Sequence, residues 1–177
     1  MKKTNVHALT EGAIMVAAAA ALGFLKLFQL PQGGSISIEM LPIFLFCSRW
    51  GWKQSFLCSF AYALLQLILD GAYAWGPTSM LLDYFLAFGI LGTACFFHRQ
   101  KGGILVGATV ACLLRFGVHF LSGITIYRIY EPTAVFHHTF TDPYLYSAIY
   151  NGGFMLPDWF ACMILLIVLR KPLEKIK

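Results

Sequence analysis

Residues 78–103 read TSMLLDYFLAFGILGTACFF followed by HRQKGG. The first twenty of them carry one ionisable charge, Asp83, and a helix of about 20 residues crosses the hydrocarbon core of a bilayer. The next six carry two basic side chains and a Gly-Gly pair, which ends a helix. This stretch therefore predicts a transmembrane helix over 78–97 that ends at a positively charged membrane surface.

The same pattern recurs along the whole chain. Hydrophobic residues make up 59% of the 177 residues, charged residues make up 12%, and the mean hydropathy is +0.71. Such values exclude a soluble domain. We expect an all-α integral membrane protein with six transmembrane helices in a single domain over 1–177. The helices are predicted over 11–30, 36–48, 54–69, 78–97, 104–127 and 144–170, the second being short and buried among its neighbours.

Basic residues sort onto one side of the predicted membrane. If the N-terminus is cytoplasmic, ten of the thirteen Lys and Arg residues lie on the cytoplasmic side, and the outer loops hold only Arg128. We therefore expect both termini to be cytoplasmic, in the cell membrane. Because these residues are spread over several loops, the net charge of +5 does not indicate nucleic-acid binding. The ten are Lys2, Lys3, Arg49, Lys53, Arg99, Lys101, Arg170, Lys171, Lys175 and Lys177.

Sequence motifs for metals and nucleotides are absent. The five cysteines lie in apolar stretches without CxxC or CxxH spacing, which predicts neither a disulfide nor a metal site. The adjacent His137 and His138 fall in the predicted outer loop 128–143 and are typical of solvated histidines. Without a G-x-x-x-x-G-K-[ST] loop, ATP hydrolysis by P-loop chemistry requires a partner subunit. We expect no resident cofactor and no metal.

Polar side chains gather in the outer parts of four predicted helices. Ionisable groups within a membrane span are costly and mark functional sites. At a rise of about 1.5 Å per residue, these groups lie within roughly the outer 12 Å of their helices. This common depth predicts one polar pocket that opens outward. The residues are Glu39, Asp83, His119, Tyr146 and Asn151.

The chemistry of these side chains indicates the kind of ligand. Carboxylates stabilise a cation, and His and Asn donate and accept hydrogen bonds at the edge of a heteroaromatic ring. Aromatic faces hold a flat or cationic ring, so we expect an aromatic, positively charged small molecule. The aromatic candidates are Tyr84, Tyr127 and Tyr146, with Tyr73 and Trp75 in the adjacent loop. Each tyrosine alone also fits the outer aromatic belt of a membrane protein.

Two more charges lie near the middle of their predicted helices. An unpaired charge at that depth costs several kcal/mol, so Arg115 and Asp158 are expected to pair. We predict a structural ion pair that braces the two helices beneath the pocket.

Small residues recur at Ala13, Ala17 and Ala21 of the first predicted helix. This spacing places them on one face and lets another helix approach closely. The contact is either internal packing or docking of a partner subunit.

Four blocks of sequence carry a family resemblance. They read IEMLP (38–42), LDY (82–84) with AFG (87–89), RFGVHFLSG (115–123) and YSAIYNG (146–152). With them the whole chain resembles the thiamine-specific S-components, which are the substrate-binding subunits of energy-coupling factor (ECF) vitamin transporters. The resemblance implies six helices, thiamine binding near the outer surface, and docking through the small-residue face of the first helix. It also implies three partners: one transmembrane coupling subunit and two ATPase subunits.

The resemblance also assigns residues to the ligand. Some family members carry Glu where Asp83 stands, and a stacking tryptophan in the first outer loop where this chain has Gly-Gly-Ser35. We therefore expect Tyr73 or Trp75 to supply that stacking. By motif position, the implied ligand contacts are Asp83, Tyr84, Arg115, His119, Tyr127, Tyr146 and Asn151. A ligand contact at Arg115 competes with the purely structural role predicted above.

The leading hypothesis is a non-catalytic membrane subunit that captures thiamine from outside for ATP-driven uptake by partner subunits. Three alternatives stay open. They are an S-component for another vitamin or a thiamine precursor, an integral-membrane enzyme with Asp83 and His119 as an acid–base pair, and a proton-coupled carrier acting alone. The sequence lacks HExxH and GxSxG motifs, and no inverted repeat indicates a lone carrier.

Overall fold

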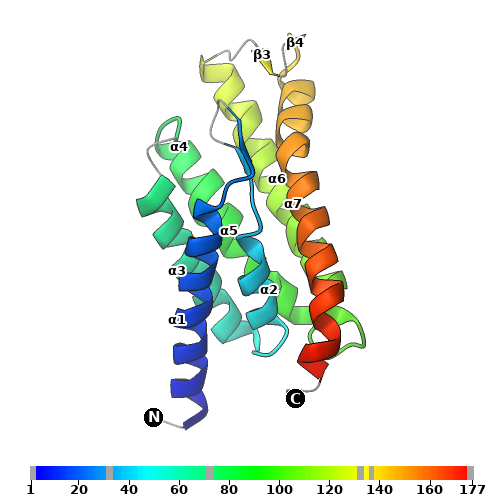
Figure 1. Cartoon of the computed structure of the whole chain (residues 1–177). Coiled ribbons are helices and arrows are strands. Elements are labelled where there is room, and N and C mark those ends of the chain that lie inside the picture. The colour runs from blue at the N-terminus through cyan, green and yellow to red at the C-terminus, as the bar shows by residue number, and fades with distance from the viewer. Residues whose placement is uncertain (1–2, 31–33, 71–73, 131–133, 136–137, 175–177) are drawn as a thin grey trace.

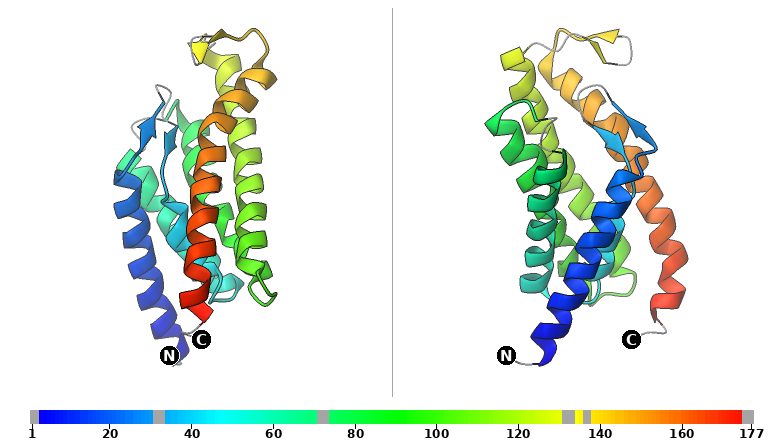
Figure 2. Two further views of the ribbon diagram at one scale, coloured as in Figure 1. Left: turned by 45° about the vertical axis from the view of Figure 1, so that its right-hand side comes forward. Right: turned by 60° about the vertical axis from the view of Figure 1, so that its left-hand side comes forward.

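The computed structural model describes residues 3–30, 34–70, 74–130, 134–135 and 138–174, which form a helical bundle with two short hairpins at one end (Figure 1). The start of α1 and the end of α7 both lie at the opposite end of the bundle (Figures 1 and 2). The long helices outside 77–97 are α1 (Lys3–Phe24), α3 (Trp52–Asp70), α6 (Gly103–Tyr130) and α7 (Pro143–Glu174). The antiparallel hairpins pair β1 (Phe28–Gln29) with β2 (Ser35–Ile36), and β3 (Ala134–Val135) with β4 (His138–Thr139).

The first helix ends earlier than the predicted boundary at residue 30. α1 ends at Phe24, and the following chain enters the β1–β2 hairpin, in which the amide of Leu27 donates to the carbonyl of Ile36 at 2.9 Å. The ammonium group of Lys26 lies 3.0 Å from the Asp70 carboxylate at the end of α3. Hairpin hydrogen bonds and this ion pair therefore take the place of further helical turns after Phe24. The hydrophobic stretch in the sequence continues past Phe24 and does not indicate this early end.

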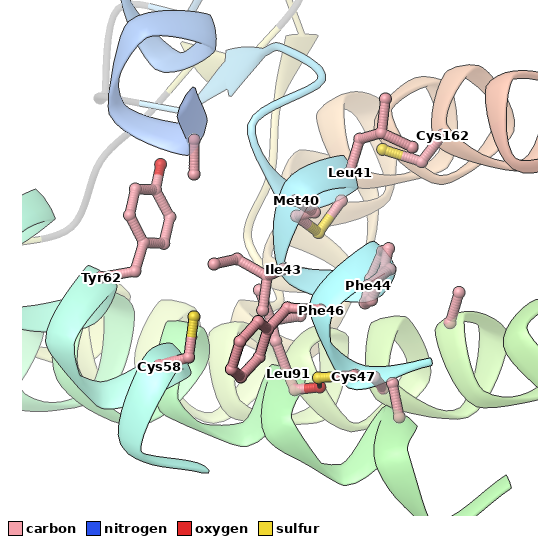
Figure 3. Close-up of a cluster of buried hydrophobic side chains, with 14 of the residues drawn as sticks. Met40, Leu41, Ile43, Phe44, Phe46, Cys47, Cys58, Tyr62, Leu91 and Cys162 are labelled. Atoms are coloured by element: carbon pink, nitrogen blue, oxygen red, sulfur yellow. Dashed lines mark hydrogen bonds between the residues drawn. The ribbon is translucent and has the colours of Figure 1, made fainter. Parts of the chain in front are cut away.

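The short helix α2 (Met40–Cys47) forms the centre of the core. Seven of its eight residues are buried, and a helix of this length extends only about 12 Å. Its side chains pack against Tyr62 and Cys58 of α3, Leu91 of the 77–97 helix and Cys162 of α7 (Figure 3). The helix is shorter than the predicted range 36–48, but the expectation that it is buried among its neighbours is confirmed.

Residues 77–97 form one helical segment with mixed winding. It runs through α4 (Pro77–Ser79), the π-helical η2 (Met80–Leu86), α5 (Ala87–Gly89) and the 3-10 helix η3 (Ile90–Phe97). Gly76 precedes it with φ 109°, a conformation that favours glycine, and Pro77 follows where its missing N–H costs nothing. π-helical turns are frequent at functional sites, and this one contains Asp83 and Tyr84.

Four helices in the described ranges are long and apolar enough to cross a membrane: Val6–Phe24, Pro77–Phe97, Gly103–Ile129 and Pro143–Leu169. α3 is 19 residues long but less apolar, since Ser55, Ser59 and Gln66 lie on its buried face. Large apolar side chains face outward instead, and Ile68 is 79% exposed. This arrangement, with polar groups inside and apolar groups outside, is that of an integral membrane protein.

Candidate ligand-binding site

A pocket of about 90 Å³ lies where β2, α3, the 77–97 helix, α6 and α7 come together. Seven of the eight residues predicted to bind the ligand line it: Glu39, Asp83, Tyr84, Arg115, His119, Tyr146 and Asn151. The remaining lining residues are Gly34, Ser35, Gln66, Asp70, Trp75, Ser79, Phe88, Gly123, Ile126, Tyr150 and Phe154. The structure thus brings polar residues from distant parts of the sequence into one site.

Tyr127 is the predicted ligand residue that does not line this pocket. Its hydroxyl donates to the backbone carbonyl of Phe140, and its ring lies 5.1 Å from the ring of Tyr146. Tyr127 therefore packs against Tyr146, which does line the pocket. Of the two loop residues expected to stack on the ligand, Trp75 lines the pocket, whereas Tyr73 lies outside the described residues.

The carboxylate of Asp83 makes three hydrogen bonds to neighbouring side chains. One carboxylate oxygen lies 2.9 Å from Nδ1 of His119. The other accepts hydrogen bonds from the hydroxyls of Ser79 at 2.6 Å and Ser122 at 2.7 Å. Three hydrogen bonds from two helices therefore hold this carboxylate in place.

The hydrogen bonds of His119 determine its tautomer. Nε2 lies 3.3 Å from Nε of Arg115, which can only donate. Nε2 is therefore the acceptor, and Nδ1 carries the proton donated to Asp83. Both ring nitrogens are thus engaged within the protein, so His119 fixes the orientation of two charged neighbours.

Arg115 pairs with Glu39 and not with Asp158. Nη2 of Arg115 lies 3.7 Å from Oε1 of Glu39, and both side chains are buried. Asp158 instead accepts a hydrogen bond from the backbone amide of Ser37 at 2.8 Å. The predicted ion pair between Arg115 and Asp158 is therefore not formed as a direct contact in this structure: Asp158 satisfies a backbone donor just before α2, and Glu39 is the ion-pair partner of Arg115.

Arg115 retains hydrogen-bonding capacity on the pocket side. Its Nη1 is buried and has no hydrogen-bond partner among the residues that the structure describes. The guanidinium carbon lies 4.1 Å from the ring centroid of Phe88, a cation–π contact that fixes its plane. An unsatisfied buried donor is costly, so Nη1 is a candidate contact for an acceptor atom of a ligand.

A row of polar side chains on α3 holds Glu39. Its Oε2 accepts hydrogen bonds from the hydroxyl of Tyr62 and the amide of Gln66, each at 2.9 Å. The amide nitrogen of Gln66 also lies 3.4 Å from the carboxylate of Asp70. The backbone carbonyl of Asp70 accepts a hydrogen bond from the hydroxyl of Tyr84 at 2.8 Å. α3 was missing from the predicted site. Its sequence signal is the recurrence of Tyr62, Gln66 and Asp70 at i, i+4 and i+8, which places them on one face.

Asn151 of α7 is fixed by hydrogen bonds at the contact between α6 and α7. Its amide nitrogen donates to the carbonyls of His119 at 3.1 Å and Ser147 at 2.9 Å. A Cβ on Gly123 would lie 2.3 Å from Oγ of Ser147 and 3.0 Å from the Asn151 amide nitrogen. Gly123 is therefore needed for this close approach. Because the two N–H bonds of Asn151 point into the protein, its oxygen remains to accept a hydrogen bond from a ligand.

Aromatic rings line the α7 side of the pocket. The rings of Tyr146 and Tyr150 are stacked and nearly parallel, with centroids 6.0 Å apart and an interplanar angle of 2°. Tyr150 accepts a hydrogen bond from the amide of Gly34 at 2.8 Å, which joins the first loop to α7. A Cβ on Gly34 would lie 2.7 Å from the ring of Phe154. A side chain at position 34 would therefore displace Phe154, and Tyr150 and Phe154 occupy this side of the pocket.

The charges that line the pocket are unbalanced. Three carboxylates (Glu39, Asp70 and Asp83) face one guanidinium, that of Arg115. Lys26 neutralises Asp70 from outside the pocket, and His119 is neutral in the tautomer described above. With both Glu39 and Asp83 ionised, one negative charge remains in this buried site, which favours a cationic ligand.

The three alanines of α1 are exposed and point away from the bundle. The buried face of the helix consists of other small residues, so internal packing does not use these three. Ala13 and Ala17 also border an apolar groove between α1 and α3. The exposed residues are Ala13, Ala17 and Ala21, and the buried ones are Ala8, Gly12, Ala19 and Gly23.

Two further expectations concern metals and cysteines. In the described ranges, no group of three or more His, Cys, Asp or Glu side chains is arranged to hold a metal ion. All five cysteines are buried free thiols.

Comparison with known proteins places the chain in a family. Residues 9–177 match the family described as thiamine transporter protein (Thia_YuaJ). The thiamine transporter ThiT of Bacillus subtilis is 34% identical over 176 residues, covering 91% of this chain and 88% of that protein. The thiamine transporter ThiT of Lacticaseibacillus paracasei is 24% identical over 161 residues, covering 82% and 77%. A solved structure of ThiT from Listeria monocytogenes shares the fold, with a TM-score of 0.83, 22% identity and 98% of each chain covered. The chain therefore belongs to the family of thiamine transporter proteins.

Proposed function

We propose that this chain is the thiamine-binding membrane subunit of an ECF-type ABC transporter, which captures thiamine outside the cell for ATP-driven uptake by partner subunits. The observation that carries the proposal is the excess of carboxylates in a buried pocket walled by aromatic rings. Membership of the thiamine transporter family supports the same ligand.

The chemistry of thiamine matches the groups that line the pocket. Its thiazolium ring carries a permanent positive charge, which the unbalanced carboxylate charge stabilises. Its aminopyrimidine ring carries an amino donor and ring-nitrogen acceptors, for which the oxygen of Asn151 and Nη1 of Arg115 are complementary. The flat rings have Tyr146, Tyr150 and Trp75 as aromatic neighbours. We assign these residues to ligand binding, together with Glu39, Asp83 and Tyr84.

The proposed topology has six membrane crossings with both termini in the cytoplasm. In this topology α2 with its flanking chain crosses the membrane among the longer helices, and α3 crosses at the periphery of the bundle with apolar side chains facing outward. The turns after α2 and η3 lie at the same end of the bundle as the start of α1 (Figures 1 and 2). These turns carry Arg49, Arg99 and Lys101, and Lys53 lies at the start of α3 at the same end, which supports a cytoplasmic location for this end.

The proposed partners are one transmembrane coupling subunit and two ATPase subunits. The exposed face of Ala13, Ala17 and Ala21 and the adjacent apolar groove between α1 and α3 form the proposed docking surface for the coupling subunit. Small residues let a partner helix approach the backbone closely. Docking through α1 leaves the ligand pocket unobstructed.

The proposed role is binding and not catalysis. An acid–base pair of Asp83 and His119 would need a ring nitrogen directed at the substrate. In this structure Nδ1 of His119 contacts Asp83 and Nε2 contacts Arg115, which favours a positioning role.

Two experiments test the proposed function. Mass spectrometry of the purified protein should identify thiamine as the co-purifying small molecule. Another vitamin or a thiamine precursor in its place would change the substrate assignment. Uptake of radiolabelled thiamine by cells should require both the coupling subunit and the ATPase subunits. Uptake by the chain alone that collapses with the proton gradient would identify a proton-coupled carrier.

A further inference from the structure

Gly23 brings the last turn of α1 against the carboxylate of Glu39. A Cβ built on Gly23 would lie 2.8 Å from Oε2 of Glu39, 3.5 Å from the hydroxyl of Tyr62 and 3.7 Å from the amide nitrogen of Gln66. These are the atoms that form the hydrogen bonds holding Glu39. Figure 3 shows the ring of Tyr62 directed from α3 towards α1. Gly23 is itself buried, so α1 closes the back of the pocket wall.

A second contact fixes the same end of α1. Lys26, just beyond the helix, pairs with Asp70 at 3.0 Å, and Asp70 lines the pocket next to Gln66. Two of the three pocket carboxylates are therefore in contact with α1 or the residues that follow it, although α1 itself does not line the pocket. The helix that presents the exposed alanine face thus also supports the charged groups of the site.

We infer that Gly23 is a positioning residue for the ligand site, which links α1 to ligand affinity through the Glu39 carboxylate. A displacement of α1 would change the packing behind Glu39 and hence the affinity for a cationic ligand. Because linkage is reciprocal, a ligand that depends on this geometry also changes the affinity of whatever docks on α1. This inference rests on the proposed function, since thiamine is the ligand used to test it.

The test titrates thiamine into the purified full chain carrying single substitutions. Gly23→Ala should weaken binding about fivefold or more, because the added methyl group displaces the Glu39 carboxylate. Gly12→Ala on the same helix is the matched control. Its Cβ would lie 3.4 Å from Phe46, an ordinary contact, and its affinity should equal that of the wild type.

A double-mutant cycle separates positioning from general damage. In a Glu39→Ala background, Gly23→Ala should cause no further loss of affinity, since the group it positions is absent. An equal loss in both backgrounds would overturn the inference. If wild type and Gly12→Ala both fail to bind thiamine, the proposed function fails. If both bind and Gly23→Ala binds equally well, only the positioning role fails.

A second measurement does not depend on Gly23→Ala folding. Phe24 is 69% exposed, and a fluorophore attached through Phe24→Cys would report on the end of α1, because the five native cysteines are buried. Saturating thiamine should change its emission in the otherwise wild-type chain but not in Glu39→Ala. Unchanged emission in the wild-type background would contradict the link.

Discussion

The guanidinium of Arg115 on α6 and the carboxylate of Glu39 at the start of α2 form a buried ion pair, with Nη2 and Oε1 3.7 Å apart. This separation exceeds that of a hydrogen bond, whereas Oε2 of Glu39 makes two hydrogen bonds at 2.9 Å. Glu39 is therefore held more closely by Tyr62 and Gln66 of α3 than by Arg115. Removing one partner leaves the other as an uncompensated buried charge.

Arg115 should couple energetically to Glu39 more strongly than to Asp158. Arg115→Met should destabilise the protein by about 3–5 kcal/mol, because it strands the buried Glu39 carboxylate. Adding Glu39→Gln should recover part of that loss, whereas adding Asp158→Asn should not. Thermal unfolding in detergent measures the free energies, with Asp158→Asn alone as the control, since Asn keeps an oxygen acceptor for the Ser37 amide. Additive losses for Arg115 and Glu39 would contradict the pairing.

The contrast between these two acids shows what sequence reasoning could and could not reach. The depth of Glu39, Asp83, His119 and Asn151 along apolar helices was sufficient to predict one pocket, since a membrane restricts where polar groups lie. The partner of Arg115 was not predictable, because it depends on how α2 and α7 are rotated within the bundle. The backbone amide of Ser37, which captures Asp158, carries no signal in the side-chain pattern.

The helix boundaries were likewise predictable only in part. The cores of the long helices were predictable from hydropathy, whereas the early end of α1 and the shortness of α2 were not. The chain between these two helices forms the β1–β2 hairpin, and Lys26 pairs with Asp70, which lies 44 residues further along the sequence. The polar face of α3 is readable from the sequence, because Tyr62, Gln66 and Asp70 recur every four residues and so lie on one face of a helix.

Asp83→Asn and Asn151→Ala should each weaken thiamine binding by about 1–3 kcal/mol, the usual cost of leaving a buried hydrogen-bonding group unsatisfied. The corresponding loss in affinity is about fivefold to hundredfold. Calorimetric titration measures it. Asp142→Asn makes the same chemical change at an exposed residue and should leave affinity unchanged. Wild-type affinity in both pocket variants would remove the 77–97 helix and α7 from the binding site.

Gly123 should be intolerant of a side chain, in contrast to Gly117 on the same helix. Gly123→Ala would push a methyl group against Ser147 and Asn151, separate α6 from α7, and lower both thermal stability and thiamine affinity. A Cβ on Gly117 meets nothing within 4 Å, so Gly117→Ala should be neutral or stabilising by about 0.5–1 kcal/mol. Equal melting temperatures for the two variants would show that the close approach of α6 and α7 is not required.

Ala17→Trp should abolish thiamine uptake while thiamine binding by the purified chain is retained. A bulky side chain on the exposed face of α1 keeps a partner helix away without touching the pocket. Leu113→Trp introduces the same side chain on α6 at a residue that is 65% exposed, and should support normal uptake. Normal uptake by Ala17→Trp would place the docking surface elsewhere.

The central claim is that a negatively charged, aromatic-walled pocket selects thiamine. Trp75 lines this pocket, so titration of the purified chain followed by tryptophan fluorescence reports directly on its occupancy. Thiamine should produce a saturable change that riboflavin and biotin, which lack the thiazolium charge, neither produce nor compete away. Tighter binding of a neutral vitamin than of thiamine would contradict the account.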